Sequence, residues 1–236
     1  MNRQGNTYTI IYSVVLVAVV GIVLALIYQA LRPKQEENIA NDTKRQILAA
    51  ARITPAEGES ISDLYNAHIK ESYIVNSEGQ KIDAGKEAFT VNVGNQVKEP
   101  ADMRELPVFV CETQDGVKYI LPVYGAGLWG PIWGYIAFDD NGDTIYGAYF
   151  AHQGETPGLG AEIEKPAFSN QFEGKNIFNK EGEFKSIAVL KAGQKANGQD
   201  AVDAISGGTI TSQGVQRMLS NSLEPYSEFL KNLNKK

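Results

Sequence analysis

An uncharged apolar stretch near the N-terminus constrains this chain more than any other feature. Residues 10–31 form a run of 22 residues without a single Asp, Glu, Lys or Arg. About 20 apolar residues in a helix cross a bilayer, whereas the apolar core of a cleavable signal peptide has about 7–15. The run also lacks a clear small-residue cleavage site. We therefore expect a retained transmembrane helix over 10–31, preceded by a short tail over 1–9.

The charges around this stretch do not fix its orientation in the membrane. Arg3 lies before it, and Arg32 and Lys34 lie after it, so the basic residues that usually mark the cytoplasmic side are nearly balanced. Beyond residue 31 the chain has 21 basic and 28 acidic residues. Such an acidic remainder gains nothing from contact with an anionic membrane surface, and it argues against a nucleic-acid partner.

The rest of the chain divides into a connector and one domain. Residues 32–54 are charged and helix-forming, which predicts a stalk helix, and Pro33 is expected to end the membrane helix. Pro55 and Gly58 mark the start of a domain over 55–236. Its middle is rich in the β-branched and aromatic residues typical of strands, over 108–111, 117–123, 132–138 and 144–150, and a further strand is expected over 186–190.

The C-terminal part of the domain has a helical pattern. Val215, Met218, Leu219 and Leu223 have the spacing of one buried helix face, and Pro225 interrupts the pattern before it resumes. A β-rich middle with helical ends predicts an α+β fold, in which an antiparallel sheet is flanked by helices.

Cysteine and histidine are too scarce for several kinds of site. Cys111 is the only cysteine, which excludes an internal disulfide and a multi-cysteine metal centre. It lies in an apolar strand pattern, so we interpret it as a core residue. Since the chain has only two histidines, His68 and His152, we expect no protein-bound metal.

Two glycine-containing segments could face a flat ligand. GAGLWG at 125–130 matches the string G-x-G-x-x-G, but a dinucleotide site needs a helix after the glycines, and here Pro131 and strand-like residues follow. We interpret it as a turn between strands that carries a π-face at Trp129. ETPGLG at 155–160 contains Pro157-Gly158, the central pair of a type II turn, whose N–H groups suit the polar edge of a heterocycle. Alone, each segment is also consistent with an ordinary turn.

A third segment, DAISGGTITS at 203–212, carries the strongest signal. Gly207 and Gly208 leave the Thr209 hydroxyl accessible, and Thr211 or Ser212 could cap the following helix. Free N–H groups and the dipole at the start of a helix stabilise an anion. A phosphate on or near Thr209 is therefore well placed, although a Gly-Gly turn before a capped helix has the same pattern.

Together these segments resemble one family, the C subunit of the sodium-translocating NADH:quinone oxidoreductase. The resemblance covers nearly the whole chain, from the N-terminal anchor through GAGLWGPIWGYIAF at 125–138, ETPGLGAEI at 155–163 and SGGTITSQGVQ at 206–216. The family carries FMN bound through its phosphate to a threonine in the pattern D-x-x-S/T-G-A-T. Asp203, Ser206, Gly207 and Thr209 match this pattern, whereas Gly208 stands in place of the usual alanine.

The resemblance implies a cofactor and its site. Thr209 would carry FMN as a phosphoester made by a flavin transferase, with Thr211 as the alternative hydroxyl. The other residues expected to bind the cofactor belong to the three segments: Ser206, Gly207, Gly208, Trp129, Glu155, Thr156, Gly158 and Leu159. We expect the isoalloxazine ring between Trp129 and Leu159, with Thr156 near its polar edge and Glu155 as the weakest candidate.

The resemblance also implies a role in a bacterial inner membrane. The chain would relay electrons within an oxidoreductase complex that carries them from NADH to ubiquinone-type acceptors and pumps sodium. Its partners would be the other subunits, and its domain would lie on the periplasmic side, without an NADH or quinone site of its own. Two alternatives stay open. One is the G subunit of an Rnf-type ferredoxin:NAD electron-transport complex, and the other is a non-catalytic membrane-anchored binding module.

Overall fold

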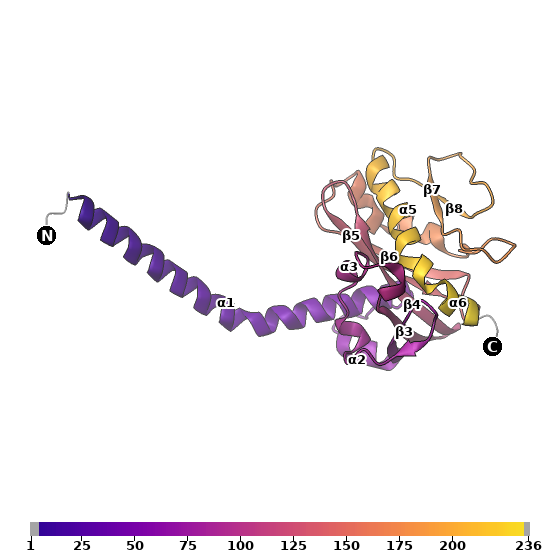
Figure 1. The fold of residues 1–236 in the computed structure, drawn as a ribbon, viewed down its shortest axis with the longest axis horizontal. Helices are drawn as coiled ribbons and strands as arrows, with labels where there is room; N and C mark the ends of the chain where they lie inside the picture. The colour runs from indigo at the N-terminus through magenta and orange to yellow at the C-terminus, as the bar shows by residue number, and fades with distance from the viewer. Residues whose placement is uncertain (1–4, 234–236) are drawn as a thin grey trace. The chain divides into compact units, whose positions relative to one another are not determined.

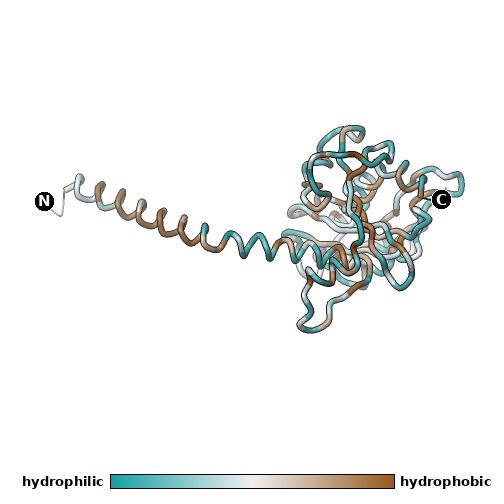
Figure 2. The backbone as a smooth tube through the Cα atoms, turned by 90° about the horizontal axis from the view of Figure 1, so that it is seen from below, coloured by the Kyte–Doolittle hydropathy of each residue, from teal (hydrophilic) through white to brown (hydrophobic). Residues whose placement is uncertain are grey.

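The computed structural model describes residues 5–233, which are divided into two compact units between Thr43 and Lys44. One helix, α1 (Asn6–Ala50), accounts for almost all of the first unit. Figure 2 shows apolar residues along the N-terminal part of α1 and hydrophilic residues after them. By length and composition α1 can cross a membrane. Of the tail expected over 1–9, residues 1–4 lie outside the described residues, and α1 begins at Asn6.

Pro33 does not end the helix, contrary to the prediction. α1 continues through this residue to Ala50. A proline inside a helix removes one N–H···O bond and its ring crowds the carbonyl four residues earlier, which can kink a helix without ending it, and the flanking residues here are good helix formers. Nε of Arg32 also lies 2.8 Å from Oε1 of Glu36. This ion pair joins residues one helical turn apart, on either side of Pro33, and supports the helix there. The expected membrane and stalk segments therefore differ in composition and share one helix.

The last turns of α1 belong to the core of the second unit. Ile47, Leu48 and Ala50 are fully buried. Nε1 of Trp133 donates a hydrogen bond to Oε1 of Gln46 at 3.0 Å, which joins this end of the helix to the sheet. The second unit accordingly starts at Lys44, upstream of the domain start expected at residue 55.

An antiparallel sheet of six strands forms the centre of the second unit, in the order β2-β1-β3-β4-β5-β6. The strands are β1 (Ile69–Val75), β2 (Lys81–Ile82), β3 (Leu106–Thr113), β4 (Gly116–Ala126), β5 (Pro131–Phe138) and β6 (Ile145–His152). The four strands predicted for the middle of the domain are confirmed as β3 to β6. Gly142 has a φ of +68°, as a tight turn between β5 and β6 requires.

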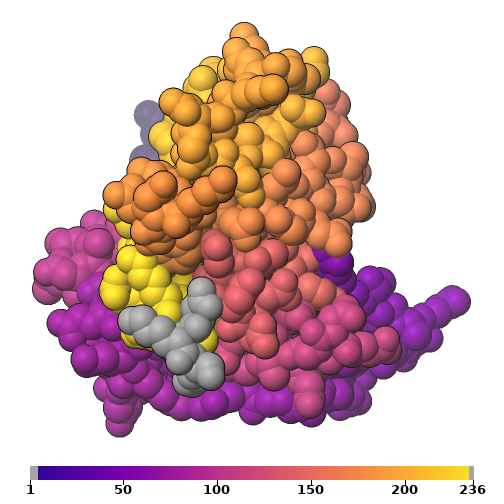
Figure 3. All heavy atoms as spheres, turned by 90° about the vertical axis from the view of Figure 1, so that its right-hand side faces the viewer, coloured from indigo at the N-terminus to yellow at the C-terminus, as the bar shows by residue number. Residues whose placement is uncertain are grey.

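Helices flank this sheet, which confirms the predicted α+β fold. They are α2 (Ile61–His68), α3 (Val93–Gln96), α4 (Pro166–Ser169), α5 (Thr209–Leu223) and α6 (Ser227–Leu233). Two short parallel strands, β7 (Ala188–Leu190) and β8 (Ala201–Asp203), form a separate small sheet. Figure 3 shows that the orange segments around this sheet and the yellow α6 lie side by side on one face.

α5 lies along β4 at very short range (Figure 1). A Cβ atom on Gly214 would lie 2.4 Å from the carbonyl oxygen of Ala126, and one on Gly125 would lie 2.7 Å from Cβ of Met218. Glycine is therefore required on both sides of the contact. This close approach places the start of α5 beside the turn that joins β4 to β5.

The sheet has a core on each face. One face packs against α5 and α6 together with a cluster of three phenylalanines, Phe150, Phe168 and Phe172. The opposite face packs against the end of α1 and contains Cys111, which is fully buried. Burial raises the pKa of this thiol to about 11, so it stays protonated at neutral pH. The interpretation of Cys111 as a core residue is confirmed.

Candidate functional site

Three segments that are far apart in the sequence meet at the start of α5, and the carboxylate of Glu155 joins them. Its Oε1 accepts a hydrogen bond from the backbone N–H of Trp129 at 2.8 Å. Its Oε2 accepts one from the hydroxyl of Thr211 at 2.5 Å. Glu155 is only 5% exposed. The residue that looked weakest from the sequence therefore connects the 125–130 turn, the 155–160 segment and α5.

Two glycines make room for this carboxylate. A Cβ on Gly127 would lie 2.4 Å from Oε1 of Glu155, and one on Gly160 would lie 2.4 Å from its Oε2. Neither glycine was singled out from the sequence as a site residue. Both glycines belong to the glycine-containing segments that the sequence analysis identified. Their spacing alone, however, does not indicate a neighbouring carboxylate.

Thr209 is the first residue of α5 and is exposed to solvent. The preceding Gly207 has a φ of +74°, a conformation that suits glycine. Gly208 occupies the N-cap position, and among the described residues no side chain caps the helix there. The first N–H groups of a helix have no partner within it. Thr209 thus lies at a helix start whose N–H donors no described side chain caps.

Thr211 and Ser212 do not cap α5, contrary to the prediction, because the helix begins two residues before Thr211. Both side chains are buried. The hydroxyl of Ser212 accepts a hydrogen bond from the N–H of Ile205 at 3.0 Å, and that of Thr211 donates to Glu155. The alternative hydroxyl named for flavin attachment is therefore inside the protein and already engaged.

Gly208 is also buried, and the family pattern has alanine at this position. A Cβ there would lie 3.0 Å from Cγ2 of Ile205 and 3.3 Å from the backbone nitrogen of Gly160. The gap is thus slightly too tight for alanine unless the Ile205 side chain moves. Ser206, the other polar residue of the pattern, is exposed in the turn before α5.

The 155–160 segment forms the expected turn, but two of its N–H groups are already hydrogen-bonded close by in the sequence. The N–H of Leu159 donates to the carbonyl of Thr156 at 3.1 Å, and Gly158 has a φ of +75°, as the type II turn requires. The N–H of Gly158 donates to Oε1 of Glu162 at 3.0 Å. The donors expected to face a heterocycle at Gly158 and Leu159 therefore stabilise the turn itself. Thr156 is exposed.

The segments that meet at the start of α5 carry exposed apolar side chains. Trp129 is 68% exposed, and Leu128, Leu159 and Ile210 are also exposed; we call these four residues the apolar rim. Gly207 lies so close to Leu159 that a Cβ would be 2.6 Å from its Cδ2. Trp129 and Leu159 were predicted, whereas Leu128 and Ile210 were missed. Exposed apolar groups gathered at one place are typical of a binding surface.

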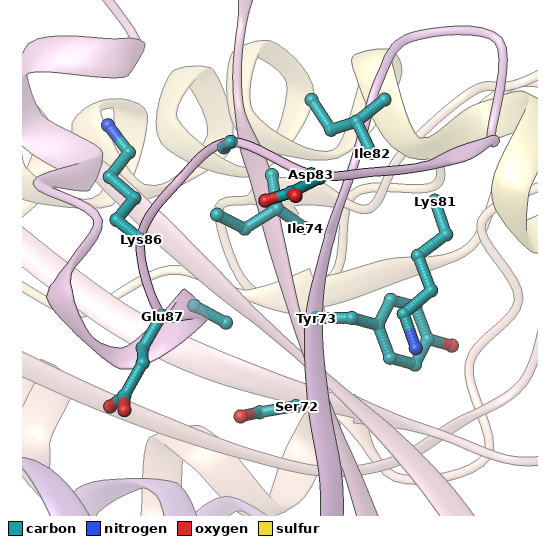
Figure 4. A pocket seen from close by; sticks show the side chains of 10 residues that line it. Ser72, Tyr73, Ile74, Lys81, Ile82, Asp83, Lys86 and Glu87 are labelled. Carbon is teal, nitrogen blue, oxygen red and sulfur yellow. The ribbon is translucent and has the colours of Figure 1, made fainter.

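Of two further cavities among the described residues, one lies away from the three segments and the other includes residues of the third segment only. The pocket in Figure 4, about 370 Å³, is lined by β1, β2 and the residues after β2. Its Lys81 and Lys86 form ion pairs with Glu71 and Glu105. A smaller cavity of about 280 Å³ lies beside Thr209, between α5 and the end of β7, and is lined mainly by polar residues, among them Lys191, Gln194, Gln213 and Gln216.

Comparison with known proteins gives a consistent picture. A family model described as an FMN-binding domain matches residues 127–224. The C subunit of the Na(+)-translocating NADH-quinone reductase of Vibrio anguillarum is 31% identical over 232 residues, covering 91% of this chain and 89% of that protein.

Two crystal structures are also similar. The C subunit of the same reductase from Parabacteroides distasonis has a TM-score of 0.78 and 51% identity, covering 85% of this chain and 96% of that one. NqrC of Shewanella oneidensis has a TM-score of 0.68 and 26% identity, covering 84% of this chain and 98% of that one.

Proposed function

Because the chain belongs to the family of Na⁺-translocating NADH-quinone reductase C subunits, we propose that it carries FMN covalently on Thr209 and relays electrons within that complex. The observation that carries the proposal is the exposed Thr209 hydroxyl at the start of α5, inside the matched FMN-binding domain. FMN supplies the chemistry, since it accepts and releases electrons one or two at a time, and the protein supplies orientation and electrostatics.

The start of α5 fits a phosphate. The N-terminal end of a helix carries a partial positive charge and free N–H donors, which suit an anion. Gly207 and Gly208 present no side chain in front of the Thr209 hydroxyl. A phosphoester on this hydroxyl would lie beside those donors. Its formation requires a flavin transferase as a partner during maturation.

The apolar rim fits the flat ring of the cofactor. The isoalloxazine ring is an amphipathic aromatic system, so an exposed indole and branched aliphatic side chains suit its faces. We propose that Trp129 and Leu159 contact the ring, with Leu128 and Ile210 extending the same surface. The exposed Thr156 supplies the hydroxyl of the 155–160 segment for the polar edge of the ring. A site at the protein surface leaves part of the ring open for electron transfer.

The proposed location rests on α1 and on the family resemblance. We propose from α1 that its apolar part anchors the chain in the inner membrane as a single pass, and from the resemblance that the acidic second unit lies on the periplasmic side. The other subunits of the complex are the partners. Neither alternative function is favoured, because the relatives described above are C subunits of the sodium-translocating reductase rather than Rnf-type G subunits or binding modules.

The test is the mass and fluorescence of the denatured full chain, produced together with its flavin transferase. We expect a flavin phosphate on the peptide that contains Thr209 and a fluorescent band on a denaturing gel. Thr209→Ala should abolish both signals. Thr209→Ser is the matched control, since it retains a hydroxyl and should keep the label. A Thr209→Ala chain that still carries flavin would refute the attachment site.

A further inference from the structure

We infer that Glu155 is a positioning residue, whose buried carboxylate fixes the flavin site and lowers the reduction potential of the flavin held there. The inference rests on the proposed attachment of FMN to Thr209. It goes further because it assigns a role to a residue that does not touch the attachment hydroxyl. It also gives a role to a charged side chain that lies in the interior at this place.

The geometry makes Glu155 the connection between the two sides of the site. One carboxylate oxygen accepts the N–H of Trp129, and the other accepts the hydroxyl of Thr211, two residues after Thr209. The backbone N–H of Glu155 in turn donates to Nδ1 of His152 at 3.1 Å. The carboxylate therefore fixes the backbone of the turn that carries the Trp129 ring relative to the first turn of α5.

The charge of Glu155 is compensated only in part. Across residues 5–233, no lysine or arginine forms an ion pair with it, and its partners are an amide, a hydroxyl and the start of α5. A buried charge without a counter-ion interacts strongly with its surroundings, because the local dielectric constant is low. Any group between Trp129 and Thr209 lies within the field of this carboxylate.

The sign of the effect on the flavin follows from electrostatics. Reduction adds electrons to the ring, and a nearby negative charge opposes that addition. The carboxylate should therefore favour the oxidised form and lower the reduction potential. It also competes with the phosphate for the positive end of α5, which makes its electrostatic role distinct from that of an ordinary capping residue.

The test is a redox titration of the flavin on the full-length, flavinylated chain. Glu155→Gln removes the charge but keeps an oxygen for the Trp129 N–H and gains an NH₂ group beside Thr211, whose hydroxyl oxygen can accept from it. We expect this variant to keep its flavin and to raise the ratio of reduced to oxidised flavin at least tenfold at a fixed potential. For a two-electron couple this corresponds to a shift of about 30 mV.

Glu164→Gln is the matched control. The substitution removes the same charge from a carboxylate that accepts the backbone N–H of His152 and lies near the ring of that histidine. It should change the ratio less than threefold. If the wild-type chain carries no flavin, the proposed function fails and this inference fails with it. If the wild type is flavinylated but Glu155→Gln matches Glu164→Gln, the inference alone is refuted.

A second variant keeps the inference testable if Glu155→Gln does not fold in a melting experiment. Thr211→Val preserves the shape of the side chain and removes one hydrogen-bond donor from the carboxylate. The charge is then less compensated, so the reduction potential should fall rather than rise. A flavinylated Thr211→Val chain with an unchanged potential would overturn the inference.

Discussion

Each end of α5 is bound by a buried charged side chain, but the two ends have different roles. At the N-terminal end the buried carboxylate of Glu155 binds Thr211, and at the C-terminal end the guanidinium of Arg104 binds Asn221. Arg104 is 8% exposed, close to the value for Glu155. A negative group at the first turn and a positive group at the last turn both complement the helix dipole.

The difference lies in what each end leaves free. Arg104 donates to the carbonyls of Val97, Glu99 and Asn221 and to the side chain of Asn221, at 2.7–3.1 Å. Its donors are thus used to hold the 97–105 loop against α5. Burial lowers the pKa of Arg104, and Glu224 acts in the opposite direction. At the other end no side chain caps the helix among the described residues and Thr209 is exposed, so this end keeps the donors and the hydroxyl that the proposed phosphoester needs.

Breaking the C-terminal end should have the largest effect on stability. Arg104→Ala removes four part-buried hydrogen bonds and the packing of a buried side chain, which should lower the free energy of unfolding by about 3 kcal/mol. Urea denaturation measures this loss. The folded fraction should still accept flavin on Thr209, because the start of α5 is unchanged. Arg104→Lys keeps the charge but only part of the hydrogen bonding, so its free energy of unfolding should lie between those of the wild type and Arg104→Ala. If the folded fraction of Arg104→Ala also fails to incorporate flavin, the distinction between the two ends of α5 is contradicted.

Breaking the N-terminal end should have a smaller effect on stability and a larger one on the flavin site. In Gly160→Ala, the new Cβ would lie 2.4 Å from both Oε2 of Glu155 and Oγ1 of Thr211. The hydrogen bond between these two side chains must therefore break. We expect a loss of about 1–3 kcal/mol in urea denaturation together with reduced flavin incorporation. Gly154→Ala is the control, since nothing lies within 4 Å of a Cβ there. If Gly160→Ala incorporates as much flavin as Gly154→Ala, the hydrogen bond between Thr211 and Glu155 is not needed for flavin incorporation.

Removing a side chain of the apolar rim should change the flavin and hardly change stability. Trp129 is 68% exposed, so Trp129→Ala should alter the free energy of unfolding by no more than about 0.5 kcal/mol. Its flavin fluorescence and absorption spectrum should change, because an aromatic contact is lost. Met103→Ala, at a residue 69% exposed and distant in sequence from all three segments, is the control. A Trp129→Ala chain that fails to fold would instead make Trp129 a core residue.

Local patterns predicted much of the fold because they depend on neighbouring residues. The alternation of β-branched and aromatic side chains indicated four strands of the sheet, and the spacing of Val215, Met218, Leu219 and Leu223 indicated the buried face of α5. β1 was missed, since its sequence IKESYIV carries polar residues on an exposed stretch. Pro33 was misjudged because an interior proline can kink a helix instead of ending it, and good helix formers flank it on both sides.

The site was predicted less completely because its connections are long-range. The three segments were identified from their glycines and from Thr209, but nothing local indicates that Glu155 bonds to Thr211, 56 residues later. Arg104 was missed for the same reason: a lone arginine before a strand resembles an ordinary surface residue until α5 packs beside it. The capping prediction failed because α5 begins at Thr209, so Thr211 and Ser212 lie inside the helix, where their hydroxyls bond to Glu155 and to the N–H of Ile205.

The burial of the end of α1 has a practical consequence for producing this protein without its membrane segment. A gene shortened to begin at codon 55 would lack Ile47 and Leu48, and the sheet face around Cys111 would lie open to water. A gene that begins at codon 44 or earlier keeps the last turns of α1, which cover this face of the sheet. The boundary for a water-soluble version is therefore set by where packing starts, several residues before the first proline of the domain.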